Sequence, residues 1–280
     1  MSSKNIRLNG MSLYNLFLRN TPLWSVFIFT VGVVFISVLI GHRLGKHFYL
    51  RSEYKTATFT SSVVAASLGL LAFMLAFTFG LATARFDMRK QILLDEVNAI
   101  GTTYLRANLL DAPASIEIKK LLLEYVDLRA DLLSKKKYQN SPQNIQDFIA
   151  SSLSIQKKLW SSASAVSKQD RQSIMTGLFI MSLNELIDLH TNRVVVALQY
   201  HIPGPIWGAL YLISILSFGL VGYEIGASGR GGIYVSIILA ITFSTVIYLI
   251  ADLDRPMQGN INVNQEPMRE LQQALHQDLP

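Results

Sequence analysis

The chain has 280 residues, of which 50% are hydrophobic and 16% charged, with a net charge of +6 and no cysteine. Its mean hydropathy of +0.33 exceeds that of a typical soluble domain and indicates an integral membrane protein. The lack of cysteine excludes disulfides, thiolate metal sites and cysteine nucleophiles. Basic residues gather at the ends of apolar segments and do not alternate with aromatic residues, which favours membrane orientation over nucleic-acid binding.

The first apolar segment covers about residues 21–41. It is long enough to cross the hydrocarbon core of a bilayer as a helix. Its length exceeds the apolar part of a cleaved signal peptide, and no small-x-small cleavage site follows before His42. We therefore predict a membrane helix that is retained.

The second apolar segment, about residues 61–84, changes abruptly into a charged stretch at Arg85 with no helix breaker between them. One continuous helix is predicted to run from membrane into water. At about 100° per residue, small residues share one narrow stripe of this helix, a pattern that allows a neighbouring helix to approach closely in lipid. The stripe consists of Gly69, Ala72, Ala76 and Gly80.

Phe73 and Phe77 project together beside the small-residue stripe, and Leu70 and Leu81 continue their row. If several copies packed around an axis, the two phenylalanines would form hydrophobic rings that can gate a pore by dewetting. The alternative is that they pack against another helix of the same subunit. Spacing alone favours this alternative.

The polar middle, about residues 85–202, is predicted to be a helical bundle without strands. Its first helix continues from the membrane to Asp111, and the next three are expected to begin near Pro113, Ser141 and Ser167. The apolar stretch 174–183 is too short to cross a membrane, so we assign it to the bundle core.

Two further spans are predicted, at about residues 203–223 and 231–251, separated by a short turn. Lys and Arg in the N-terminal tail (Lys4, Arg7 and Arg19) and after the second span place both segments inside the cell. With four spans, the C-terminus is inside as well. The basic loop after the first span argues against this orientation, because it holds Arg43, Lys46, Arg51 and Lys55 against only Glu53.

No catalytic or metal site is apparent in the sequence. No histidine lies three or four residues from another histidine or within a suitable carboxylate motif, so neither a metal nor a cofactor is expected. The charged residues of the bundle, among them Asp95 and Glu96, are expected to form solvated faces or salt bridges between helices. Asp252 and Asp254 follow the last span, where an ion pair or a helix-end interaction is favoured over a cation site.

Two stretches resemble the bestrophin-like family of bacterial membrane proteins and, more distantly, the bestrophin anion channels. They are AFMLAFTFGLATARFDMRKQILLDEVNAIGTTYLRANLL (72–110) and IYLIADLDRPMQGNINV (247–263). In bestrophins the second span carries pore-facing apolar residues four apart, followed eight residues later by an Arg that begins an Arg-aromatic motif. The spacing of Phe73, Phe77 and Arg85-Phe86 is the same.

The resemblance implies an all-α, four-span subunit with a contiguous cytoplasmic helical bundle, forming one bestrophin-like domain over residues 1–280. It implies a homopentamer in the cell (inner) membrane, in contact with lipids, with both termini cytoplasmic and one axial pore. Gly69 stands where the channels carry a bulky apolar residue, and no counterpart of the acidic calcium-binding run of animal bestrophins follows the last span.

Our leading hypothesis is an oligomeric channel, not an enzyme, that passes anions such as chloride. Phe73 and Phe77 would form its hydrophobic neck, beside Gly69, Leu70 and Leu81. Arg85 would raise the local anion concentration at the inner end. The alternative is a membrane-anchored scaffold or regulatory protein whose helical bundle binds a partner.

Overall fold

The computed structural model describes residues 21–49, 57–134, 142–228, 233–255 and 259–278, and these form helices with short connections and no strand. They divide into two compact units. The apolar unit contains the described parts of 1–84, 201–255 and 259–261, and the polar unit contains those of 85–200 and 262–280. The N-terminal basic residues, together with Arg51 and Lys55, lie outside the described residues.

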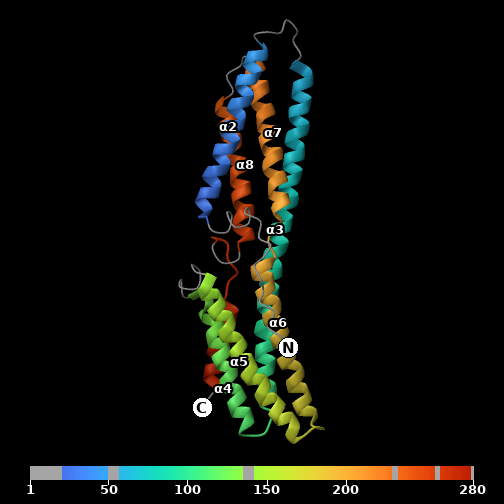
Figure 1. Ribbon diagram of the computed structural model, residues 1–280, viewed down its shortest axis with the longest axis vertical. Coiled ribbons are helices and arrows are strands. Elements are labelled where there is room, and N and C mark those ends of the chain that lie inside the picture. Colours follow the sequence, from blue (N-terminus) through green and yellow to red (C-terminus); the bar gives the residue numbers. More distant parts are fainter. Residues whose placement is uncertain (1–20, 50–56, 135–141, 229–232, 256–258, 279–280) are drawn as a thin grey trace. The chain divides into compact units, whose positions relative to one another are not determined.

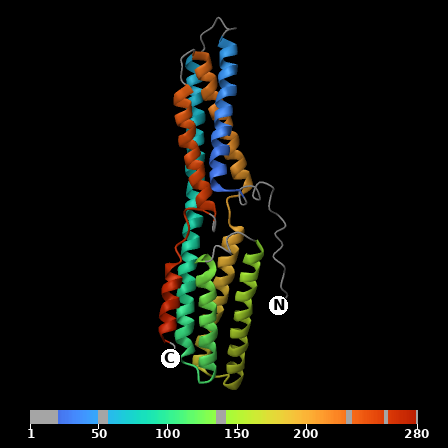
Figure 2. The same ribbon diagram turned by 90° about the vertical axis from the view of Figure 1, so that its left-hand side faces the viewer.

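The apolar unit is built from α2 (Leu23–Tyr49), the first part of α3 (Ala57–Ala107), α7 (Gly204–Ser228) and α8 (Ile233–Asp254). In both views these segments lie side by side (Figures 1 and 2). The model has four helical segments long and apolar enough to cross a membrane. The four predicted spans correspond to them, except that residues 231–232 lie outside the described part of the chain.

Helix α3 is continuous through the change from apolar to charged sequence at Arg85, as predicted. Its 51 residues correspond to about 76 Å of helix, roughly two and a half times the thickness of the hydrocarbon core. Inside the apolar unit it packs toward α7, where Ser217 Oγ donates a 3.1 Å hydrogen bond to the carbonyl of Ser67. The charged half of α3 begins the polar unit.

The closest helix contact of the apolar unit joins α2 to α7 and depends on glycine. A Cβ atom on Gly41 would lie 1.9 Å from the carbonyl oxygen of Gly219, and one on Gly45 would lie 2.1 Å from that of Tyr223. From the other side, a Cβ on Gly222 would lie 2.1 Å from the carbonyl oxygen of Val38. Only glycine therefore allows the two backbones to approach this closely.

The polar unit packs the charged half of α3 with α4 (Ala114–Ser134), α5 (Pro142–Gln169), α6 (Ile174–Gln199) and α9 (Glu266–Asp278). Each helix turns an apolar stripe inward, as the spacing predicts. The fully buried members of the core include Ile100 on α3, Leu122 on α4, Leu159 on α5, Leu183 on α6 and Met268 on α9.

Two features of the polar unit differ from the sequence prediction. The prediction that a helix begins at Ser167 is wrong, because α5 continues to Gln169 and the N-cap of α6 is Ser173, whose side chain accepts from the Thr176 amide at 3.2 Å. The assignment of residues 174–183 to the core holds for one face only. Phe179 and Leu183 are fully buried, whereas Ile174 is 76% exposed.

Helix α9 was not predicted. It packs against α4, where the carboxylate of Asp127 accepts from Gln272 at 2.7 Å and lies 2.8 Å from His276 Nε2. The signal was present in the spacing of Met268, Leu271 and Leu275, an apolar stripe that follows an acidic first turn.

Candidate functional site

The phenylalanine pair of α3 is exposed. Phe73 is 65% and Phe77 52% accessible, and Leu70 beside them is 52% accessible. The opposite side of the helix, which includes Leu71 and Leu75, is buried. The interpretation that Phe73 and Phe77 pack against another helix of their own subunit is therefore wrong for the described residues.

The small-residue stripe beside the pair is also uncovered. A Cβ atom placed on Gly69 or on Gly80 would meet nothing within 4 Å among the described residues. This differs from Gly41 and Gly45 of α2 and from Gly222 and Gly226 of α7, whose Cβ positions are occupied by backbone. The close approach that the stripe permits is therefore not used within one subunit.

The exposed face of α3 differs in composition from those of α2 and α8. Helix α2 exposes Ile28 and Ile36, and α8 exposes Val235 and Ile238, which are bulky apolar residues suited to contact with lipid tails. The face of α3 instead combines glycine and alanine with Phe73 and Phe77. In lipid, small residues are typical of helix contacts.

Leu81 and Arg85 lie at the edge of the exposed face and are partly buried. Around the helix, Arg85 is about 80° from Phe77 and about 120° from Phe73. Asp87, which is exposed, lies only about 40° from Phe73. The predicted site residues thus share one helix, and Asp87 lies as far around it from Phe77 as Arg85 does, about 80°, but on the other side.

Asp252 and Asp254 make helix-end and turn interactions, as the sequence favoured. One carboxylate oxygen of Asp252 accepts from the backbone amide of Asn260 at 2.7 Å. Asp254 accepts from the amide of Ile202 at 2.9 Å, just before α7 begins. The described residues contain no group of three or more potential metal ligands among His, Cys, Asp and Glu.

A buried ionic cluster, which we call the Glu96 cluster, lies in the polar unit and was not predicted as such. Glu96 of α3 has no exposed surface. Its carboxylate accepts from Arg129 Nη2 on α4 at 2.8 Å, from Arg193 Nη1 on α6, and from the Tyr125 hydroxyl at 2.9 Å. One carboxylate thereby joins three helices.

The charges of the Glu96 cluster determine its protonation. Burial alone would raise the pKa of Glu96, but Arg129 and Arg193 together lower it to about 2. Burial, with Arg129 adding to it, lowers the pKa of His190 to about 4. At neutral pH the cluster therefore contains a carboxylate and a neutral imidazole.

Tyr125 connects His190 to this carboxylate. Burial and then Glu96 raise the pKa of the Tyr125 hydroxyl, so it stays protonated, and its single proton is directed to Glu96. His190 Nδ1 lies 3.1 Å from the same hydroxyl oxygen. Because that oxygen donates elsewhere, Nδ1 must carry the imidazole proton and donate it.

Taken together, these features define a helical membrane protein with four candidate spans, an exposed aromatic and small-residue face on the second, and a polar bundle fixed by an internal ion cluster. The model of the bestrophin-like domain matches residues 28–268. The chain belongs to the bestrophin-like family.

Solved structures of bacterial homologues have the same fold. A bestrophin homologue from Klebsiella pneumoniae, solved as a point mutant, superimposes with a TM-score of 0.67 at 16% identity, over 90% of this chain and 98% of that one. A second mutant of that protein gives 0.66 at 16% identity over the same shares. A structure described as a membrane protein gives 0.64 at 16% identity, over 91% and 97%. No curated protein matches the sequence.

Proposed function

We propose that the protein is an oligomeric membrane channel whose pore is lined by the exposed face of α3. The observation that carries this proposal is the exposure of Phe73 and Phe77 beside a small-residue stripe that no described part of the subunit covers. Membership of the bestrophin-like family supports it.

The composition of the face favours contact between copies over contact with lipid. A helix in contact with lipid gains nothing from glycine at Gly69 and Gly80, whereas a helix packed against another copy gains close approach. If copies pack against one another through this stripe around a common axis, Phe73 and Phe77 of each subunit face that axis. By the family resemblance we propose five copies.

The two phenylalanines then form two stacked hydrophobic rings that constrict the pore. Such a constriction controls conduction through its wetting. Gly69, one turn from Phe73, adds no third ring, while Leu70 and Leu81 border the neck. Transport through it is passive and involves no covalent step, so we propose that the protein is not an enzyme.

We propose that the permeant ions are anions such as chloride. Arg85 and the net charge of +6 support this by raising the local anion concentration. Asp87 has the opposite effect, and it is both exposed and closer to the line of Phe73. Selectivity is therefore expected to depend on the balance between these two side chains.

The orientation that we propose follows the Lys and Arg distribution and the family. The protein crosses the cell (inner) membrane four times, residues 1–280 form one domain, and the polar unit and both termini face the cytoplasm. Membrane lipids surround the assembly.

The test is current recording from purified protein in planar bilayers under a tenfold salt gradient. A fully anion-selective pore gives a reversal potential of about 59 mV, and a cation-selective pore gives the same value with opposite sign. Phe77→Ala should raise the current about twofold or more by widening the constriction. Phe79→Ala is the matched control, since Phe79 is 41% exposed but lies about 160° around the helix from Phe77.

The two parts of the proposal can fail separately. If Phe77→Ala leaves the current unchanged, the neck assignment is wrong. If wild-type protein gives no current and instead co-purifies with one stoichiometric soluble partner, the chain is a scaffold and the channel proposal fails. If the reversal potential has the cationic sign and Asp87→Asn reverses it, the pore conducts but anion selectivity is wrong.

A further inference from the structure

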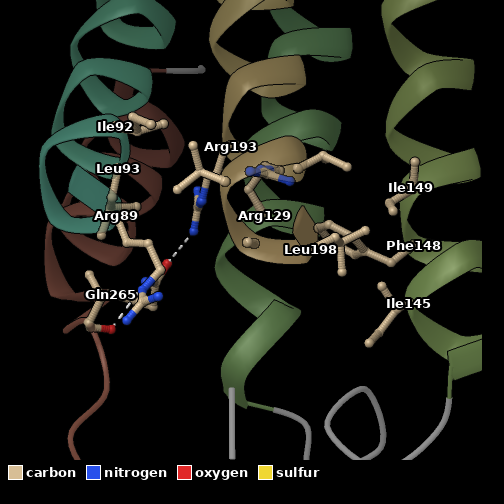
Figure 3. A pocket seen from close by; sticks show the side chains of 14 residues that line it. Arg89, Ile92, Leu93, Arg129, Ile145, Phe148, Ile149, Arg193, Leu198 and Gln265 are labelled. Carbon is tan, nitrogen blue, oxygen red and sulfur yellow. Dashed lines mark hydrogen bonds between the residues drawn. The ribbon is translucent and has the colours of Figure 1, made fainter. Parts of the chain in front are cut away.

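The polar unit contains an open cavity lined by residues of α3, α4, α5 and α6 and of the segment before α9 (Figure 3). Its empty volume is about 740 Å³, with the mouth to solvent included. None of the pore-face residues of α3 belongs to its lining, so a ligand could bind in this cavity whether or not the protein is a channel.

Three arginines line the cavity: Arg89, Arg129 and Arg193. Arg129 and Arg193 both bind the carboxylate of Glu96, so these two cations share one anion. The described residues that line the cavity include no Asp or Glu. The lining is therefore positively charged overall.

Arg129 is held tightly within this wall. Its side chain is only 2% exposed, and its guanidinium carbon lies 5.3 Å from the centre of the Phe148 ring. Its Nε–H group is buried and has no hydrogen-bond partner in the described part of the chain. Native structures rarely leave such a donor unsatisfied, because the cost is that of a lost hydrogen bond.

The rest of the cavity is apolar. Ile145, Phe148 and Ile149 of α5 lie across from Arg89 and Arg193 in Figure 3, and Val194 and Ala197 of α6 complete the wall. A ligand that satisfied only the arginines would leave this apolar surface in water. A ligand that satisfied only the apolar wall would leave Arg129 and Arg193 with the single carboxylate of Glu96 between them.

We propose that the cavity is a binding site for an organic carboxylate with an apolar body. The planar guanidinium group matches a carboxylate in geometry and charge, and the aliphatic and aromatic wall accepts the body. A phosphate dianion would lose more hydration on entering a mostly apolar cavity, so a carboxylate is the better fit. The site selects one negative charge joined to hydrocarbon.

The test is isothermal titration calorimetry of the full chain in detergent micelles with 4-phenylbutyrate, after subtraction of the titration into micelles alone. Saturable binding at one site per subunit is expected. Two matched compounds separate the contributions: 4-phenylbutanol has the same body without charge, and 4-phenylbutylamine has the opposite charge. Each should bind at least about tenfold more weakly, since the ionic hydrogen bonds are lost.

Two variants locate the site. Arg89→Gln removes one charge without removing either ion pair of Glu96, and should weaken 4-phenylbutyrate binding about tenfold or more. Ala197→Phe fills the cavity without changing its charge and should abolish binding. Arg171→Gln is the matched control, because Arg171 is exposed and outside the lining, and should bind as the wild type does.

Circular dichroism and the elution volume show whether each variant is folded. Loss of binding in folded Arg89→Gln and Ala197→Phe, with retention in Arg171→Gln, supports the proposal. Equal binding of 4-phenylbutyrate and 4-phenylbutanol overturns it, since the site would then be merely apolar. Equal binding of inorganic phosphate, absence of wild-type binding, or unchanged binding in folded Ala197→Phe also overturns it.

Discussion

Replacing Glu96 with glutamine should destabilise the polar unit severely. Glu96 is fully buried and is the shared ion-pair partner of Arg129, which is 2% exposed, and Arg193, which is 13% exposed. Glutamine keeps the volume but leaves both guanidinium groups without their counter-ion. Removing one partner of a buried ion pair costs about 3–5 kcal/mol.

The lowered pKa of Glu96 points in the same direction. A fall in pKa from 4.5 to about 2 means that the folded protein, compared with the unfolded chain, favours the ionised over the protonated carboxyl by about 3 kcal/mol more. A neutral glutamine resembles the protonated form. The cost of removing one partner of a buried ion pair and the lowered pKa therefore both predict that Glu96→Gln lowers the free energy of unfolding by about 3 kcal/mol or more.

The assay is hydrogen exchange of α4 and α6 amides in the full chain at pH 7, which reports local opening of these helices. A loss of about 3 kcal/mol accelerates exchange by roughly a hundredfold. Asp95→Asn is the matched control, because Asp95 is only partly buried and accepts one bond from Gln91, so its loss should cost about 0.5 kcal/mol or less. Exchange in Glu96→Gln within threefold of wild type would refute the reasoning.

Two further predictions concern acid and helix packing. His190 stays neutral in the folded protein to about pH 4 but binds a proton below about pH 6.5 in the unfolded chain. The free energy of unfolding should therefore fall between pH 6.5 and 4 by up to about 3 kcal/mol. A folded His190→Asn variant should not show this fall, and a variant whose stability depends on pH as that of the wild type does would contradict the role given to His190. Gly41→Ala should lower the unfolding temperature through overpacking of about 1–3 kcal/mol, since its Cβ would meet backbone at 1.9 Å. Gly32→Ala on the same helix should leave the unfolding temperature unchanged, because a Cβ there would meet nothing within 4 Å. If both variants lowered the unfolding temperature equally, the close contact would be unimportant for stability.

The spans and the continuous α3 helix could be predicted because they depend on local sequence. Twenty or so uncharged residues specify a span by length alone, and the absence of a breaker before Arg85 specifies continuity. The family resemblance added the expectation that Phe73 and Phe77 face a pore. Spacing could not decide this, because whether a face is covered depends on helices distant in the sequence.

The Glu96 cluster agrees with one of the two expectations for the charged residues, salt bridges between helices, but its burial and its partners were not predicted. Asp95 and Glu96 are adjacent, yet only Glu96 shares the inward stripe of α3 with Leu93 and Ile100, which are both buried. An acid on an apolar stripe indicates a buried partner, but the partners on α4 and α6 are set by tertiary packing. Without them, solvated faces or salt bridges were the more general expectation.

The α2–α7 contact was also present in the sequence and was not recognised. Gly41 and Gly45 form one small-xxx-small pair, and Gly222 and Gly226 form another. Gly69 and Gly80 also share a small-residue stripe, but they have no neighbour within the described subunit. A small-residue motif thus indicates a contact without saying whether the partner is the same chain or another copy.

The glycine contact between α2 and α7 also restricts how the apolar unit can move. Where side chains separate two helices, rotamer changes let one helix slide or turn against the other. Here the carbonyl oxygens of one helix rest directly over the Cα atoms of the next, a geometry that also permits weak Cα–H···O bonds. Rotation of α2 about its axis would bring a side chain such as Leu44, which lies about 100° around the helix from Gly45, against backbone. The pair must therefore move as a single body, and any conformational change in the apolar unit has to occur at its other helix contacts.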